Sequence, residues 1–198
     1  ITLGENAKSD FYIDLIPPRG SINILQDQIS PEFMNIYITF DEPIDEWKSE
    51  LFITHNSETT SHNFPVNNND NIYGITELFP GLGTIEIDVE SWDAVGNGTL
   101  SSVSIAYDEI LAEVGKSIFS PSETFMMRFD KHDVASDASI LIKESNFPDL
   151  SANKTSFQQV SQIYDVSSIN MEIIEPIDIA IEIPSNLLDL EFWKFKVF

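Results

Sequence analysis

Apolar and polar residues alternate along much of this chain, as they do in β-strands. The clearest case is residues 84–90, where an isoleucine or valine at every second position is flanked by Glu or Asp. A period of two gives a strand one buried side and one solvent-facing side. The sequence that follows, DAVGN at residues 93–97, contains residue types that reverse the chain. We expect Asp93 and Asn97 to hydrogen-bond backbone amides within this turn.

Other segments with the same alternation predict further strands, separated by turns rich in Pro, Gly and Asn. In the first half they are residues 11–16, 21–25, 35–40, 50–54, 72–75 and 101–107. In the second half they are residues 124–129, 138–143, 176–183 and 193–197. The pattern predicts no amphipathic helix of useful length. The expected fold class is therefore all-β, with two tandem β-sandwich domains at residues 1–109 and 110–198, the second of which could be truncated.

Two segments of the first half resemble bacterial immunoglobulin-like (Big-type) surface modules. Residues 83–97 are similar to the penultimate strand and closing turn of such modules. Residues 36–44, with the sequence IYITFDEPI, are similar to an earlier strand of the same families. The resemblance implies an immunoglobulin-like β-sandwich in the first domain and an extracellular parent protein.

The end of the second half resembles β-sandwich modules related to the ZU5 domain. The similarity lies in Tyr164-Asp165 and in residues 175–184, although a phenylalanine and the first proline of that pattern are missing. The resemblance implies that Pro176 opens a strand, where a missing N–H is tolerated. It also implies that alternate isoleucines of this strand point inward: Ile177, Ile179, Ile181 and Ile183.

Charge and cysteine content narrow the classes of partner. The net charge is −23 over 198 residues, and there is no cysteine. Such a negative field repels nucleic acid and anionic lipid, so we expect neither as a partner. No apolar run is long enough for a bilayer span, so we expect no membrane insertion by this segment. The absence of cysteine fits a cytosolic protein as well as a bacterial surface protein, and the resemblance to surface modules implies secretion or display at the cell surface.

Acidic side chains make Ca²⁺ the one cofactor candidate, because hard cations prefer clustered carboxylate oxygens. Asp108 and Glu109 lie where the two predicted domains meet, and Asp14, Asp41 and Glu42 lie in loops of the first domain. We predict that these five residues could share a Ca²⁺ site at the module junction. The alternative is that the acidic residues serve only solubility.

A binding surface is predicted on the acidic side of residues 84–90. Glu86, Asp88 and Glu90 project from one face, and Trp47 and Trp92 fall on or beside outward positions. Carboxylates could bind a cation or a basic partner, and exposed Trp rings could stack on a surface glycan. The alternatives are a solvated face that prevents sheet-edge pairing and tryptophans packed in a core or between modules.

Catalytic signatures are absent from the sequence. It has no cysteine nucleophile, no G-x-S-x-G elbow and no phosphate-binding glycine loop. His55, His62 and His132 match no zinc spacing, and we expect them to be exposed loop residues. We therefore predict a non-enzymatic stalk, spacer or adhesion element that contacts other domains of its own polypeptide and could bind a surface glycan or protein. Two alternatives are accessory modules that position substrate for a secreted cell-wall hydrolase, and a subunit of an extracellular filament.

Overall fold

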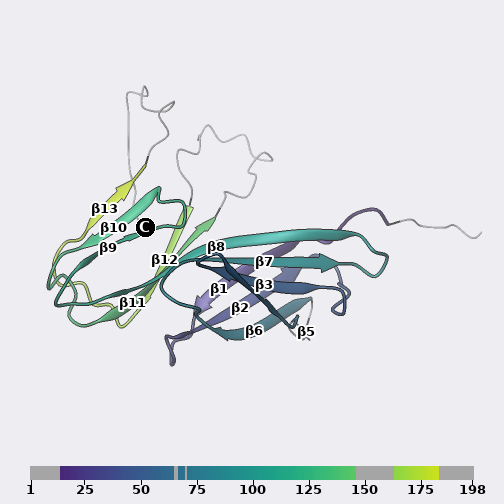
Figure 1. Ribbon diagram of the computed structural model, residues 1–198, viewed down its shortest axis with the longest axis horizontal. Helices are drawn as coiled ribbons and strands as arrows, with labels where there is room; N and C mark the ends of the chain where they lie inside the picture. The colour runs from purple at the N-terminus through teal and green to yellow at the C-terminus, as the bar shows by residue number, and fades with distance from the viewer. Residues whose placement is uncertain (1–13, 65–66, 70, 146–162, 183–198) are drawn as a thin grey trace, which may run out of the picture.

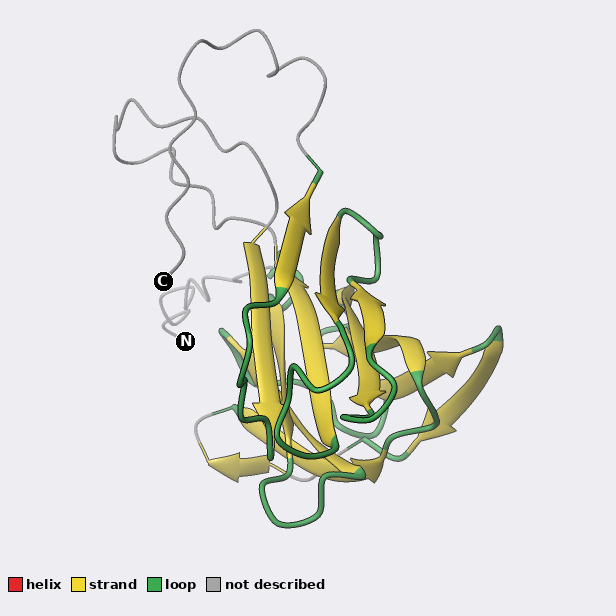
Figure 2. Ribbon diagram, turned by 90° about the vertical axis from the view of Figure 1, so that its left-hand side faces the viewer, coloured by secondary structure: helices red, strands yellow, loops and turns green. Residues whose placement is uncertain are grey.

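The computed structural model describes residues 14–64, 67–69, 71–145 and 163–182, and the regular structure in these ranges is entirely β-strand (Figures 1 and 2). The strands of the first half are β1 (Gly20–Gln26), β2 (Phe33–Phe40), β3 (Glu50–His55), β4 (Glu58–His62), β5 (Asn67–Asn69), β6 (Ile72–Leu78) and β7 (Gly83–Trp92). The remaining strands are β8 (Gly98–Ile110), β9 (Lys116–Phe119), β10 (Phe125–Phe129), β11 (Ala138–Ser145), β12 (Ile163–Ile169) and β13 (Asp178–Ile181). None of the described segments is a helix that could cross a membrane.

The strands form three antiparallel sheets. The first sheet has the order β1-β2-β6-β5, the middle sheet β12-β11-β8-β7-β3-β4, and the third sheet β13-β10-β9. Strand β8 is central to the middle sheet, because its first part pairs with β7 and its last part pairs with β11. Figure 1 shows this long strand leading from one half of the molecule to the other.

Two hydrophobic cores lie on opposite faces of the middle sheet. The first core, between the first and middle sheets, consists of Ile24, Met34, Ile36, Ile38, Phe40, Leu51, Ile53, Tyr73, Phe79, Ile85, Ile87, Val89, Ile105, Tyr107 and Leu141. The second core, between the middle and third sheets, consists of Ala106, Ile110, Ile118, Phe125, Met127, Phe129, Val134, Ile140 and Ile142. Residues that are adjacent in sequence therefore belong to different cores. Ile105 and Leu141 lie in the first core, whereas their neighbours Ala106 and Ile140 lie in the second. This follows from strand geometry, since successive side chains point to opposite faces of a sheet.

The all-β prediction is confirmed, and the two clearest predicted strands of the first half lie within β7 and β8. Ile85, Ile87 and Val89 of β7 are fully buried, as their alternation predicts. The predicted boundary between residues 109 and 110 falls inside β8, so it divides a strand that both cores use.

Three other expectations about strands have different outcomes. The predicted strand at residues 11–16 is wrong for its described part, because residues 14–16 are not in a strand. Ile179 and Ile181 do not point into a closed interior but are 48% and 38% exposed, because β13 is an edge strand of the small third sheet. Residues 193–197, with Trp193, lie outside the described residues, as does Ile183.

Candidate functional site

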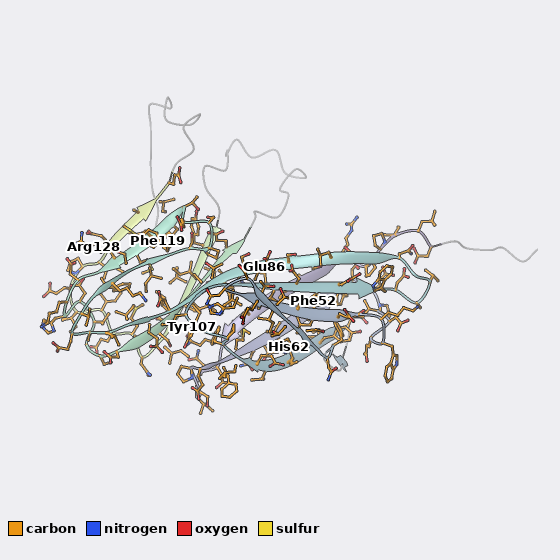
Figure 3. The ribbon with its side chains drawn as sticks, viewed as in Figure 1. Phe52, His62, Glu86, Tyr107, Phe119 and Arg128 are labelled. Carbon is orange, nitrogen blue, oxygen red and sulfur yellow. The ribbon has the colours of Figure 1, made fainter. Side chains whose placement is uncertain are left out.

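The acidic residues of β7 form one row on the solvent side of the middle sheet. Glu86, Asp88 and Glu90 occupy the outer positions of a strand whose inner positions are fully buried. Across the sheet, Phe52 of β3 lies beside Asp88, and Figure 3 labels Phe52 and Glu86. Ser102 of β8 donates a hydrogen bond to the Asp88 carboxylate. The predicted surface is therefore an acidic sheet face with an aromatic side chain within it.

Trp92 lies at the end of this face, and its ring covers the backbone of Gly98 on the neighbouring strand. A Cβ atom at Gly98 would lie 2.8 Å from the ring, so only glycine allows this close approach. A cavity of about 430 Å³ opens there. Its lining residues are Glu90, Trp92, Gly98, Thr99 and Leu100. An aromatic ring beside a carboxylate can stack on a sugar ring or bind a cation.

Trp47 lies near the same end of the molecule, on the turn that precedes β3. The backbone N–H of Asp45 in this turn donates to the carbonyl of Trp92 at 2.6 Å. The Trp47 side chain is 98% exposed, so it packs in no core. The structure therefore places both tryptophans of the predicted surface at one end of the acidic face, where Trp92 is half-buried and Trp47 fully exposed.

Three carboxylates meet at the turn between β7 and β8. Ligand oxygens of Asp14, Glu42 and Asp93 lie within 4.8 Å of one another. Burial raises the pKa of Glu42, and the negative charges of Asp14, Asp41 and Asp93 raise it further. Close carboxylates at such distances disfavour their own ionisation, and a cation would relieve this repulsion.

Asp93 is buried and already has hydrogen-bond donors. Its Oδ1 atom accepts the backbone N–H groups of Val95, Gly96 and Asn97 at 2.6–2.9 Å, and its Oδ2 atom accepts the Asn97 amide at 2.6 Å. Burial acts to raise the pKa of Asp93, but these hydrogen bonds outweigh it and lower the pKa. The predicted role of Asp93 in the turn is confirmed, and the turn fixes Asp93 where it completes the carboxylate group. The expectation for the Asn97 side chain is wrong, because its amide donates to Asp93 and to the carbonyls of Asp14 and Ile16. Sequence reasoning assigned Asp93 to the turn and left it out of the Ca²⁺ site.

The other predicted Ca²⁺ ligands do not join this group. Asp41 accepts the backbone N–H of Arg19 at 2.8 Å. Asp108 forms an ion pair with Lys116, and its carboxylate also accepts the N–H of Glu109. Gly98, at the start of β8, lies close to the carboxylate group, and Asp108 lies ten residues further on, or about 33 Å along the strand. The five predicted ligands are therefore divided between opposite ends of β8.

Two of the histidines are strand residues, so their assignment to exposed loops was wrong. His55 ends β3, and its ring bonds the carbonyl of Leu82 at 2.9 Å. His62 ends β4 and lies 3.1 Å from Glu77 of the first sheet. His132 is the exception, because it lies exposed in a loop as expected. Period-two reading missed β4 because its sequence, ETTSH, contains no apolar residue.

His62 also contacts Thr60, and the three residues form a chain of the kind that activates nucleophiles. Its Nε2 atom is 2.9 Å from the Thr60 hydroxyl, while its Nδ1 atom faces Glu77. The Thr60 hydroxyl, however, also bonds the carbonyl of Ile53 at 3.2 Å. Acyl transfer further requires donors for an oxyanion and a cavity for the substrate. None of the three residues lines the cavity at Trp92, and the chain of hydrogen bonds ties edge strand β4 to the first sheet.

Comparison with family models, with curated proteins and with solved structures finds no match for this chain. The resemblances to Big-type and ZU5-like modules therefore stay predictions.

Proposed function

We propose that this chain is a non-catalytic spacer or adhesion element of a larger secreted or cell-surface bacterial protein. In this proposal it consists of two β-sandwich units, the first immunoglobulin-like. The observation that supports a spacer is the middle sheet, which contributes to both cores. Strand β8, with 13 residues, spans about 43 Å and runs through both units without a break. A continuous hydrogen-bonded strand resists bending better than a linker, and a spacer has to hold its distal neighbour at a fixed distance.

The composition is compatible with work outside the cell. A net charge of −23 favours solubility and opposes adsorption to anionic surfaces. A chain without cysteine needs no oxidative folding, so its stability is the same in reducing and oxidising surroundings.

The cavity at Trp92 favours a second candidate, a module that positions substrate for a secreted hydrolase. A half-buried ring beside Glu90, with the exposed side chain of Leu100 in the same lining, offers a stacking surface for a glycan. In this case the chain would still perform no chemistry of its own.

Small-angle X-ray scattering of the full chain tests the spacer. A rigid element should give one maximum dimension that stays constant between low and high salt, because the two units share strands. A profile that requires two bodies moving about a hinge would contradict the proposal. Binding of cell-wall glycans that is lost in Trp92→Ala would instead favour the positioning module.

A further inference from the structure

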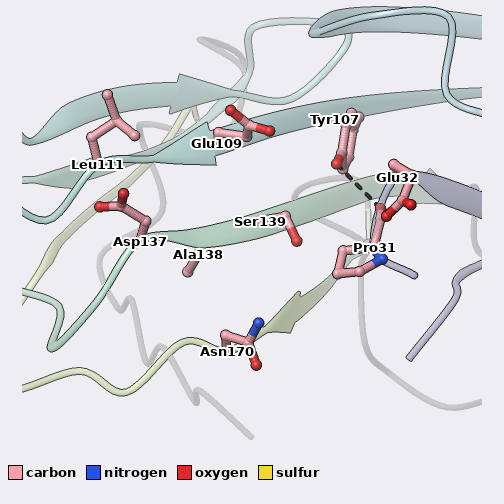
Figure 4. A pocket seen from close by; sticks show the side chains of 9 residues that line it. All are labelled: Pro31, Glu32, Tyr107, Glu109, Leu111, Asp137, Ala138, Ser139 and Asn170. Carbon is pink, nitrogen blue, oxygen red and sulfur yellow. Dashed lines mark hydrogen bonds between the residues drawn. The ribbon is translucent and has the colours of Figure 1, made fainter. Parts of the chain in front are cut away.

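A second cavity, of about 370 Å³, lies where the middle sheet extends past the first sheet (Figure 4). Four segments surround it: the β1–β2 connection, the end of β8, the start of β11 and the residue after β12. The lining residues are Pro31, Glu32, Tyr107, Glu109, Leu111, Asp137, Ala138, Ser139 and Asn170. The cavity thus lies on the face of the middle sheet that carries the first core, beyond the last residues that the first sheet covers.

Negative charge from three segments converges on this cavity. Glu32 comes from the β1–β2 connection, Glu109 from β8 and Asp137 from the loop before β11, while the nine lining residues include no Lys, Arg or His. Asp137 is held in place because its Oδ1 atom accepts the backbone N–H of Ala112 at 2.9 Å. Burial raises the pKa of Tyr107, and the carboxylates of Glu109 and Glu32 raise it further against the opposing effect of the Gln26 amide. Both carboxylates are therefore close enough to act on the same hydroxyl group.

A buried glutamine behind the lining residues holds part of the cavity wall in place by hydrogen bonds. The Gln26 side chain is 4% exposed and donates from Nε2 to the Pro31 carbonyl at 2.9 Å and to the Ser139 hydroxyl at 2.6 Å. Its Oε1 atom is buried and has no hydrogen-bond partner among the described residues. The Tyr107 hydroxyl donates to the Pro31 carbonyl at 3.2 Å, as Figure 4 shows. The Gln26 amide therefore holds Pro31 and Ser139 in place, and its N–H end faces these two lining residues.

Apolar surface accompanies the charge. Leu111 lines the cavity and is 47% exposed, and Ile29 in the β1–β2 connection is 92% exposed. The Tyr107 ring stacks on Phe79 with a centroid separation of 3.8 Å, which fixes the floor. A ligand that complements this site needs positive charge on an apolar stem.

The spacing of the carboxylates distinguishes between kinds of cation. Among the described residues, the only three-residue group with ligand atoms within 4.8 Å of one another is Asp14, Glu42 and Asp93. The oxygens of Glu32, Glu109 and Asp137 are therefore further apart than one metal ion requires, since Ca²⁺ holds its ligands at about 2.3–2.6 Å. A guanidinium or ammonium group has several N–H donors and longer contacts, so it can satisfy separated carboxylates.

We propose that this cavity binds a basic side chain, arginine or lysine, that a partner protein presents. The cation would lie beside Glu109 and Glu32, with Asp137 at the other end of the cavity (Figure 4), its stem would pack on Leu111, and the partner surface around it would cover Ile29. This site lies apart from Trp92 and from the carboxylates at the β7–β8 turn, and it goes beyond the spacer function without depending on it.

Titration of the ¹⁵N-labelled full chain with N-acetyl-arginine methylamide tests the proposal. The backbone amides of Ser139 and Asn170 should shift on titration, with saturation in the millimolar range, as expected for one side chain taken from its partner (about 1 mM corresponds to about −4 kcal/mol). The matched neutral probe, N-acetyl-citrulline methylamide, should leave these amides unchanged. No shift with the arginine probe up to about 20 mM, or equal shifts with the citrulline probe, would overturn the proposal.

Two variants with the same change in net charge distinguish binding at this cavity from attraction by the overall negative charge of the protein. Glu109→Gln should weaken binding of the arginine probe by roughly fivefold, as expected for one lost partly exposed ion pair. Glu86→Gln, on the other side of the middle sheet, should change the affinity by less than about twofold. Equal weakening in both variants would show attraction by the whole negative surface and would overturn the assigned site. Both replacements keep the side-chain shape, and the unchanged spectrum of each free variant checks that it is folded.

Discussion

Replacing Leu141 by alanine should destabilise the first core, although this residue comes from the second half of the chain. Leu141 is 2% exposed and belongs to the first core, together with residues of β1, β2 and β7. Truncating a buried leucine costs about 2–5 kcal/mol, through lost burial and the cavity that remains. Ile140 is the matched control, because it is fully buried, adjacent in sequence and part of the second core. Ile140→Ala should cost a similar amount.

The two cores share β8 and β11, so we expect both variants to lower one common unfolding transition. With a urea m-value of about 2–3 kcal/mol/M, each midpoint should fall by about 1 M. Hydrogen exchange read separately at β2 and β10 then reports on each core. Each variant should speed exchange in both strands. If Leu141→Ala affected only β2 and Ile140→Ala only β10, the reasoning from a shared sheet would be refuted.

Three further predictions concern glycine geometry, pH and Ca²⁺. Gly115→Ala should lower the free energy of unfolding in urea by about 3 kcal/mol, because the φ of Gly115 is +73° and a Cβ would lie 2.6 Å from the Phe129 carbonyl oxygen. Gly96→Ala, where φ is +99° and no described atom lies within 4 Å of the added Cβ, should lower it by only about 1 kcal/mol. Equal losses in the two variants would contradict this. Glu42→Gln should raise the melting temperature at pH 7 without Ca²⁺. Because the pKa of Glu42 is raised in the folded state, its ionised form opposes folding as pH rises through that pKa. The higher melting temperature of the variant should therefore vanish at acidic pH, where Glu42 of the wild type is protonated. A difference in melting temperature that is constant at all pH values would argue against repulsion. If the carboxylate group of Asp14, Glu42 and Asp93 binds Ca²⁺, millimolar Ca²⁺ should raise the melting temperature of the wild type and not of Glu42→Gln. A chelator should reverse the effect. No shift in the wild type would remove the Ca²⁺ hypothesis.

Local patterns in the sequence predicted local structure well. Alternation in residues 84–90 predicted the buried and exposed sides of β7, and the DAVGN sequence predicted the hydrogen bonds of Asp93. Both depend on residues close together in the chain, where side-chain direction and turn chemistry follow from backbone geometry.

The shared middle sheet depends on contacts between distant residues, which alternation does not reveal. The pairing of β8 with β11, and the first-core position of Leu141, join segments about 35 residues apart. A signal was nevertheless present: alternation fails at residues 105–107 and 140–142, where consecutive residues are apolar and all are buried. Such runs are typical of strands covered on both faces.

Only those parts of the candidate sites that lie on one strand could be predicted from the sequence. Glu86, Asp88 and Glu90 share a face because they share a strand. Asp14 and Glu42 meet Asp93 only through the fold, and Asp108 is separated from them by the length of β8. Gln26, which lies behind the lining of the second cavity, bonds a serine 113 residues away and has no sequence signature.

A fragment that ends at residue 109 tests the shared sheet most directly, since it keeps the first sheet and most of β8 but lacks β11. Thermal unfolding followed by circular dichroism, together with amide dispersion in an NMR spectrum, would compare it with the full chain. Without Leu141 and the ladder between β8 and β11, the fragment should lose dispersed signals or melt far below the full chain. A fragment with native dispersion and the melting temperature of the full chain would show two independent domains and contradict the account.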